Sequence, residues 1–507
     1  MKNTFKYLAL FAAAATMVSC ANEFDDSVED GDQYEAGEAD FSKYVAVGNS
    51  LTAGFADAAL YLEGQEDSYP AIMAQQFTLV GGGEFFQPLV ADNLGGVLAG
   101  GVQILPNRLV LAATPDLGPA VLAGTPTTDI TNRVTGDLNN FGVPGAKSFH
   151  LGAPGYGNLA GVATGTANPY YVRFASSDNA TVIGDAVAAD PTFFTLWIGN
   201  NDILSFATSG GDGNDRNSDD DDDDDDTGVD LDPRTYGSND ITNVNVFASV
   251  YSGYVDALTA NGAKGALINI PDVTSIPFFT TVPFNAIPLD GQTAAGVNMA
   301  YAQYNGGLLA AEAAGFIDSD EREARTINFV AGQNGPVLDD EDLTDLSALG
   351  LPNLRQADED DLIVFTAATV LGTLADPNNP NSVRGVGVPL EDGNVLTRVE
   401  QDRIEDAQEA YNNVIAGIAA QKGLALVDAR SFLAQVADGG VAFDGGVLTS
   451  TYATGGAFSL DAVHPTPRGY AFTANAILEA INAQYGSTVP PVNIGQYKGV
   501  QPSNNVQ

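Results

Sequence analysis

A serine with only small neighbours follows a short apolar run near the amino terminus, in the stretch KYVAVGNSLTAG (residues 43–54). The apolar residues 44–47 are typical of a buried strand, and Gly48 ends the run two residues before Ser50. A serine at the carboxyl end of a strand, next to helix N–H groups, can act as a nucleophile. An ordinary turn, in which glycine supplies the backbone angle and Asn or Ser caps the next helix, explains the same residues. A base elsewhere in the sequence would distinguish the two interpretations, because a nucleophilic serine needs a base and a serine in an ordinary turn does not.

The chain contains two histidines that could be that base, His150 and His464. His464 lies in SLDAVHPTPRGYAF, three residues after Asp461. In a turn, this spacing can bring the carboxylate beside the imidazole Nδ1, which fixes the tautomer and leaves Nε2 free to take the serine proton. Asp-x-x-His is a weak motif alone, since a helix-capping aspartate beside an unrelated histidine gives the same pattern. With Ser50, the pair predicts a catalytic triad.

Acyl-transfer chemistry also needs hydrogen-bond donors for an oxyanion. The stretch NNFGVPGAKSF contains Gly145 in a turn of small residues, where its backbone N–H could face a reacting centre. The stretch WIGNNDIL contains Gly199 and Asn201 at the end of an apolar run, and an asparagine there can direct its side-chain amide at an oxyanion. Ordinary turn chemistry for Gly145 and an Asx turn for Asn201 are the alternatives.

Strand-like runs that alternate with helical patterns would position these residues. A buried-strand pattern begins the stretch FFTLWIGNNDIL. A helix, a turn and a strand are predicted for VFASVYSGYVDALTANGAKGALINIPDV, and the same order is predicted for RIEDAQEAYNNVIAGIAAQKGLALVDA. PRGYAFTANAILEAINAQYG predicts a closing helix that ends at Gly486. This alternation predicts an α/β fold, with a parallel sheet covered by helices on both faces.

Two regions interrupt the alternation. Residues 211–240 contain eight consecutive aspartates, Asp219 to Asp226, which we predict to be a solvated acidic loop because the run cannot form a packed core. Calcium binding by this run is an alternative, although it lacks the spaced ligands and central glycine of an EF-hand loop. Residues 276–395 mix helical stretches with acidic loops, and we predict an insertion there that could cap the site.

The composition limits the possible partners. The chain of 507 residues is 44% hydrophobic, which suffices for a core, and carries 65 acidic against 20 basic residues, a net charge of -45. Such a surface repels nucleic acid, so we expect no nucleic-acid partner.

The amino terminus has the pattern of a targeting segment. An apolar run over residues 8–18 is too short to span a bilayer as a mature helix, and it ends in MVSC, with Cys20 the only cysteine of the chain. This end resembles the lipobox of bacterial lipoproteins, which implies a signal peptide over residues 1–20 and lipidation at Cys20. Residues 21–40 predict an acidic tether. The resemblance implies a lipid-anchored protein of the cell envelope, in the outer membrane of a Gram-negative bacterium.

Four short motifs together resemble one family. GNSLTAG, NFGVPGA, GNND and DAVH are similar, in family order, to blocks I, II, III and V of the SGNH, or GDSL-type, hydrolases. The resemblance implies a single hydrolase domain over residues 41–507, folded as a flavodoxin-like three-layer α/β/α sandwich with a parallel sheet and a long mixed insertion. One position departs from the family, because Asn49 stands where an aspartate is usual.

The resemblance also implies roles and a reaction. It implies a serine esterase or lipase that cleaves carboxylic esters through an acyl-enzyme, with no metal and no cofactor. The implied triad is Ser50, Asp461 and His464, and the implied oxyanion donors are Ser50, Gly145 and Asn201. The ester could be a lipid, an acetylated glycan or a small acyl ester, and Cys20 would supply the membrane contact. The alternative is a catalytically lapsed surface lipoprotein that binds glycan or protein.

Overall fold

The computed structural model describes residues 34–113, 117–217 and 230–507. The predictions for the signal peptide, Cys20 and the aspartate run Asp219–Asp226 lie outside the described residues, as does most of the predicted tether. Among the helices of the described ranges, none is both long enough and apolar enough to cross a bilayer.

A parallel five-stranded sheet forms the centre of the described structure. Its strands, in spatial order, are β7 (Asn140–Gly142), β1 (Tyr44–Gly48), β8 (Phe193–Trp197), β9 (Lys264–Ile268) and β16 (Ala425–Val427). All five residues of β1 and all five of β8 are buried, as the apolar runs predict for central strands covered on both faces. Numbered along the chain, the strand order is 2-1-3-4-5, the flavodoxin-like order, so the predicted fold class is confirmed.

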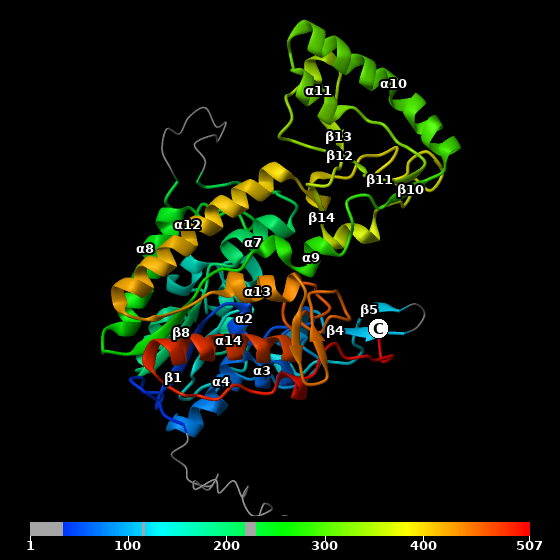
Figure 1. Cartoon of the computed structure of the whole chain (residues 1–507). Coiled ribbons are helices and arrows are strands. Elements are labelled where there is room, and N and C mark those ends of the chain that lie inside the picture. Colours follow the sequence, from blue (N-terminus) through cyan, green and yellow to red (C-terminus); the bar gives the residue numbers. More distant parts are fainter. Residues whose placement is uncertain (1–33, 114–116, 218–229) are drawn as a thin grey trace, which may run out of the picture.

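Helices cover both faces of this sheet (Figure 1). On one side lie α4 (Tyr69–Phe77) and α14 (Pro467–Tyr485); on the other lie α6 (Val182–Ala188), α8 (Val244–Thr259) and α12 (Arg398–Lys422). Shorter helices at the ends of strands are α2 (Ser50–Ala53), α3 (Leu62–Glu66), α5 (Pro169–Val172), α7 (Asn201–Thr208) and α13 (Ala429–Ala437).

Capping residues mark the ends of the long helices α12 and α14, which is why the sequence pattern predicts where they begin and end. The α12 helix begins with a capping box between Thr397 and Glu400 and ends at Gly423 in the left-handed conformation. The α14 helix begins at Pro467 after the cap Thr466 and ends at Gly486, as predicted.

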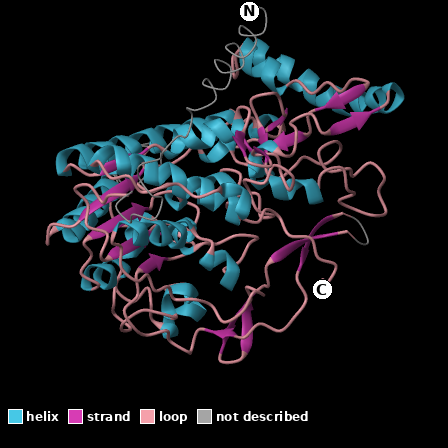
Figure 2. Ribbon diagram, turned by 60° about the horizontal axis from the view of Figure 1, so that its bottom comes forward, coloured by secondary structure: helices cyan, strands magenta, loops and turns pink. Residues whose placement is uncertain are grey.

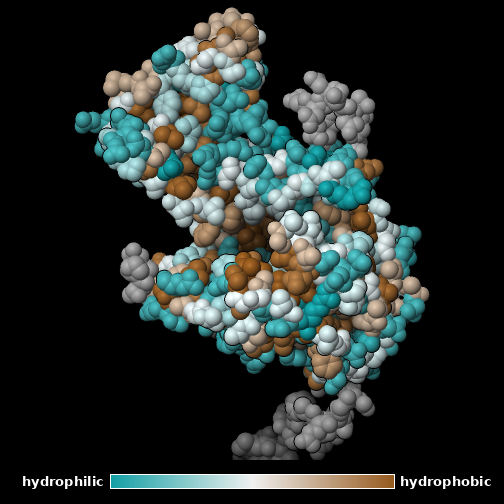
Figure 3. Space-filling model, turned by 180° about the vertical axis from the view of Figure 1, so that it is seen from behind, coloured by the Kyte–Doolittle hydropathy of each residue, from teal (hydrophilic) through white to brown (hydrophobic). Residues whose placement is uncertain are grey.

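The chain between β9 and α12 forms a lobe of its own beside the sheet (Figure 1). Its elements are α9 (Pro277–Thr280), β10 (Ile287–Leu289), α10 (Gly291–Ala314), α11 (Ser319–Arg325), β11 (Gly332–Asn334), β12 (Val337–Asp339), β13 (Leu354–Gln356), β14 (Leu362–Ile363) and β15 (Val395–Leu396). A separate cluster of buried side chains holds the part that includes α10 and α11, while the segments at both ends join the main core. Seen from behind, the lobe stands above a hollow with apolar side chains on its wall (Figure 3).

Small antiparallel hairpins complete the molecule, and in Figure 2 they lie among long loops away from the sheet. They are built from β2 (Val97–Ala99), β3 (Val102–Leu105), β4 (Leu109–Ala112), β5 (Gly118–Val121), β17 (Val441–Phe443) and β18 (Gly446–Leu448), with β6 (Thr128–Asp129) pairing in parallel with β2. The carboxyl-terminal residues pair with β4 and next to β5, through bridges from Pro502 to Leu111 and from Val506 to Leu122.

Candidate active site

Ser50 is the first residue of α2, directly after the carboxyl end of β1. Gly48 is required there, because a Cβ at that position would lie 2.2 Å from the Thr52 hydroxyl and 2.3 Å from the Trp197 carbonyl oxygen. The short helix ends at Gly54, whose φ of +81° favours glycine. The small residues around Ser50 are thus required by close packing of the strand–helix turn.

The Ser50 hydroxyl contacts His464, a residue that lies 414 positions further along the chain. Ser50 Oγ lies 2.9 Å from His464 Nε2, and His464 Nδ1 lies 2.9 Å from Asp461 Oδ2. The Phe55 ring packs against the imidazole, with ring centroids 4.7 Å apart. Hydrogen bonds therefore join the hydroxyl of Ser50, the imidazole of His464 and the carboxylate of Asp461, the three residues of the predicted triad, into a relay.

The Asp461 carboxylate is held by backbone and side-chain donors. Oδ1 accepts hydrogen bonds from the N–H groups of Val463 and His464 and from the Ser459 hydroxyl, and Oδ2 also accepts from the Ala58 N–H at 2.9 Å. Burial alone would raise the pKa of Asp461, but the charge and hydrogen bonds of His464, with the Val463 N–H, lower it to about 2. Asp461 is therefore ionised at any pH near neutrality.

The Ala58 N–H that donates to Asp461 belongs to a strained loop that the sequence pattern does not predict. Asp57, Ala58 and Ala462 all have a left-handed backbone, with φ of 53°, 61° and 65°. Such conformations cost non-glycine residues about 1–3 kcal/mol each, so the surroundings must impose them. Bonds between the loops do so here, because the Asp57 N–H donates to Ser459 Oγ and the Asp57 carboxylate accepts the Leu460 N–H.

His150 lies elsewhere and has a different environment. Its Nδ1 accepts the Lys147 N–H, and its ring stacks on Tyr156 with centroids 4.7 Å apart. Burial and the nearby Lys147 charge lower the pKa of His150 to about 4. Of the two histidines, the structure brings His464 alone to the serine.

Two of the predicted oxyanion donors, Gly145 and Asn201, lie shortly after the two strands that flank β1. Asn201 begins α7 after β8, and its side-chain amide donates to the Ala146 carbonyl at 2.9 Å, which leaves a second amide hydrogen. Gly145, next to Ala146, is exposed at a φ of +79° in the turn that follows β7. Within the described residues, no hydrogen bond engages the backbone N–H of Ser50 or of Gly145.

A hydrogen bond joins the side chains of Asn49 and Asn200, a contact that the sequence pattern does not predict. Asn49 caps α2 by accepting the Leu51 N–H, and its own amide donates to Asn200 Oδ1 at 3.0 Å. An aspartate at position 49 could make the cap but could not donate. The motif GNND contains Asn200 directly before Asn201, so this motif is the sequence feature that could have indicated a role for Asn200 at the site.

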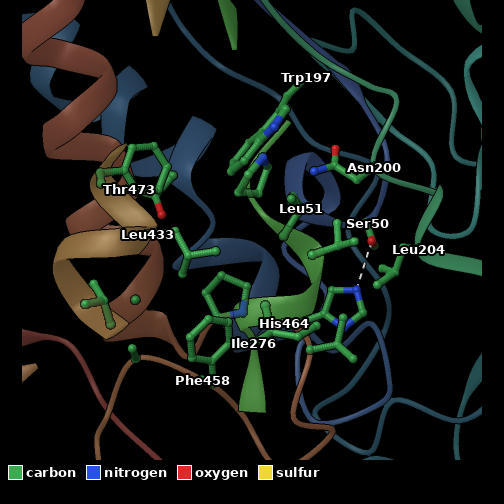
Figure 4. A pocket seen from close by; sticks show the side chains of 18 of the residues that line it. Ser50, Leu51, Trp197, Asn200, Leu204, Ile276, Leu433, Phe458, His464 and Thr473 are labelled. Carbon is green, nitrogen blue, oxygen red and sulfur yellow. Dashed lines mark hydrogen bonds between the residues drawn. The ribbon is translucent and has the colours of Figure 1, made fainter. Parts of the chain in front are cut away.

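A largely apolar pocket opens beside the relay (Figure 4). Ser50, Asn200, Asn201 and His464 lie on its wall, whereas Gly145 does not. The remaining lining comes from α2, the end of β8, α7, α13, α14 and the connecting loops, and includes Leu51, Trp197, Leu204, Ile276, Leu433, Val436, Phe458 and Thr473. Of residues 276–395, this wall includes Ile276 alone, so the lobe does not cap the pocket in this conformation.

The site lies where the strand order of the sheet reverses, between β1 and β8. Ligands of open α/β sheets bind beyond the carboxyl ends of the strands at this point. A serine hydroxyl bonded to a carboxylate-oriented imidazole, beside an apolar pocket, can attack an electrophilic carbon and can return the proton to a leaving group.

Comparison with known proteins shows two solved structures that align with this chain. No family model and no curated protein matches the sequence. A mutant acetyl-xylooligosaccharide esterase from Geobacillus aligns with a TM-score of 0.30 and 11% identity, over 88% of this chain and 96% of its own. A candidate GDSL-like lipase from Parabacteroides merdae aligns with a TM-score of 0.30 and 10% identity, over 88% of this chain and 99% of its own.

Proposed function

We propose that this protein is a serine hydrolase that cleaves carboxylic esters through an acyl-enzyme, as the resemblance to SGNH hydrolases implies. The observation that carries the proposal is the relay of 2.9 Å contacts from Ser50 Oγ through His464 to the Asp461 carboxylate. Two further features support it: the apolar pocket beside the serine, and the free backbone N–H of Ser50 at the start of α2.

The proposed reaction proceeds in two acyl transfers. His464 Nε2 takes the hydroxyl proton while Ser50 Oγ attacks the ester carbonyl, and the ionised Asp461 stabilises the imidazolium that forms. The oxyanion is held by the Ser50 N–H, the Gly145 N–H and the second amide hydrogen of Asn201. His464 then gives its proton to the departing alcohol. Water, activated by the same histidine, attacks the acyl-serine and releases the acid and the free hydroxyl.

A fluorophosphonate probe tests the proposal most directly. We expect a single covalent adduct on Ser50, because the relay makes this hydroxyl more nucleophilic than an ordinary serine. Peptide mass spectrometry after digestion locates the adduct, and Ser50→Ala is the matched control that should remain unlabelled. A folded protein that hydrolyses no ester and takes no label would instead support the lapsed hydrolase that only binds glycan or protein.

The pocket points to an ester with an apolar acyl group. Its wall consists mainly of aliphatic and aromatic side chains from α2, α7, α13, α14, the end of β8 and the connecting loops, and Thr473 is among the few polar side chains on it. An acetyl group would leave most of this surface in contact with water. A longer acyl chain would bury it, at a gain of about 0.8 kcal/mol per CH₂.

We therefore expect kcat/KM to rise with acyl length. For p-nitrophenyl hexanoate compared with the acetate, the expected ratio is about tenfold to a hundredfold, somewhat below the full transfer gain for four CH₂ groups. Leu433→Trp, which fills the pocket from α13, should remove most of this preference and leave acetate hydrolysis nearly unchanged. The melting temperature of the variant serves as its folding control. Equal rates for both esters would contradict an acyl pocket here.

The cellular setting is part of the same proposal and rests on the sequence alone. We place the enzyme in the bacterial cell envelope, anchored to the outer membrane through a lipid on Cys20. The mass of the amino-terminal peptide of the mature protein checks this anchor.

A further inference from the structure

A cluster of carboxylates lies outside the relay, where the lobe meets α12. Glu341, Asp392 and Glu400 each direct one carboxylate oxygen into a common space, and these oxygens lie within 4.8 Å of one another. Glu341 follows the β12 strand, Asp392 precedes β15, and Glu400 lies in the first turn of α12. Three segments that are distant in sequence thus converge on one point.

Glu400 makes this cluster different from a solvated acidic surface. The residue is 0% exposed, and its Oε2 accepts the Thr397 N–H in the capping box of α12. Its Oε1 is buried and has no hydrogen-bond partner among the described residues. A capping box explains one oxygen of Glu400 and leaves the other unexplained, since a buried carboxylate oxygen normally has a partner.

The surroundings offer little compensation for this negative charge. Asp212, Asp340 and Asp342 add to it, and the nearby arginines are engaged, Arg403 with Asp342 and Arg355 with Asp340. Burial and then the neighbouring carboxylates raise the pKa of Asp392 to about 7. Burial, opposed in part by the Thr397 N–H, raises the pKa of Glu400 to about 8. The cluster therefore needs either protons or a cation.

We propose that Glu341, Asp392 and Glu400 bind a calcium ion that ties the lobe to the α/β body. Carboxylates are hard oxygen ligands and suit Ca²⁺ or Mg²⁺. Oxygens on opposite sides of a bound Ca²⁺ lie about 5 Å apart, and the three carboxylate oxygens lie within this span of one another. The proposed ligands include no residue of the aspartate run and none of the residues proposed for ester cleavage.

The ion would also fix the end of α7, the helix that begins at Asn201. The turn after α7 packs directly on the cluster, because a Cβ at Gly211 would lie 1.7 Å from Glu400 Oε1. A Cβ at the neighbouring Gly210 would lie 2.6 Å from the Gly393 carbonyl carbon, next to Asp392. Calcium binding should therefore stabilise the protein, with a secondary effect on the proposed active site.

Calcium titration of the chelator-stripped full chain tests the proposal, by calorimetry and by thermal unfolding at constant ionic strength. At pH 8.5 we expect one saturable site and a rise in melting temperature of about 3–5 °C at a hundredfold excess over Kd. Protons compete with calcium, so the shift should be smaller at pH 6.

Matched variants decide which residues bind the ion. Glu400→Gln keeps the cap acceptor and should abolish the calcium shift, and Asp392→Asn should do the same if the first variant fails to fold. Replacing Asp219–Asp226 by asparagines should leave the shift intact. No shift in the parent at pH 8.5, a shift lost only with the aspartate run, or a larger shift with magnesium chloride would overturn the proposal.

Discussion

Replacing His464 by alanine should lower kcat for a soluble ester by about a millionfold, the loss typical of removing the base of a serine triad. The reason is geometric: Nε2 of this ring is 2.9 Å from Ser50 Oγ, and no other histidine lies near the serine. Stopped-assay hydrolysis of a p-nitrophenyl ester measures kcat, and an unchanged melting temperature shows that the fold is retained.

His150→Ala is the matched control for this result. His150 stacks on Tyr156 away from the serine, so its replacement should leave kcat within about twofold and affect stability alone. Asp461→Asn supplies an intermediate case, since it keeps the shape but favours the wrong tautomer, at a cost of about ten-thousandfold in kcat. Loss of activity in His150→Ala, with activity kept in His464→Ala, would reverse the assignment of the base.

The second large effect is expected at Asn201. Asn201→Ala should lower kcat by about a hundredfold to a thousandfold, with little change in KM, because an oxyanion donor acts only once charge has developed on the substrate oxygen. A saturation curve on a soluble ester separates the two parameters. A change confined to KM would mean that Asn201 only helps to bind the ground state.

Asn200→Ala distinguishes the two adjacent amides. Asn200 also lies on the pocket wall, but its Oδ1 is engaged by Asn49. We expect a loss of no more than about tenfold in kcat for this variant. If Asn200→Ala caused the larger loss and Asn201→Ala the smaller, Asn200 would be the donor and the assignment from GNND would be wrong.

The parallel sheet could be predicted from the sequence because its central strands have the apolar composition that is typical of buried strands. Residues 44–47 are a continuous apolar run that ends at Gly48, and residues 193–198 are apolar except for Thr195 and end at Gly199. The helices α12 and α14 have caps at both ends. The relay was also predictable, since two histidines left little choice of base and Asp461 lies in the same turn as His464.

Contacts made by backbone atoms and by distant segments were not predictable. The Ala58 N–H that holds Asp461 belongs to a residue whose side chain carries no chemical signal. The pocket wall combines α7, α13, α14 and the end of β8, which become neighbours only through packing. The same holds for Glu341, Asp392 and Glu400, since acidic residues are frequent throughout this chain and only the fold reveals which of them is buried.

The distance of 414 residues between Ser50 and His464 has a consequence for the order in which the protein is made. Four strands of the sheet, β1, β7, β8 and β9, are complete by Ile268, so a chain that emerges amino terminus first can assemble most of the sheet when little more than half of the chain has emerged. The base and its aspartate emerge nearly two hundred residues later. Closing so long a loop costs little more free energy than closing a shorter one, since the cost grows with the logarithm of length. The long separation therefore delays the formation of the relay but does not prevent it. Until the segment that contains Asp461 and His464 has been made, the chain has a serine without its base, and a chain truncated before this segment keeps an unactivated serine.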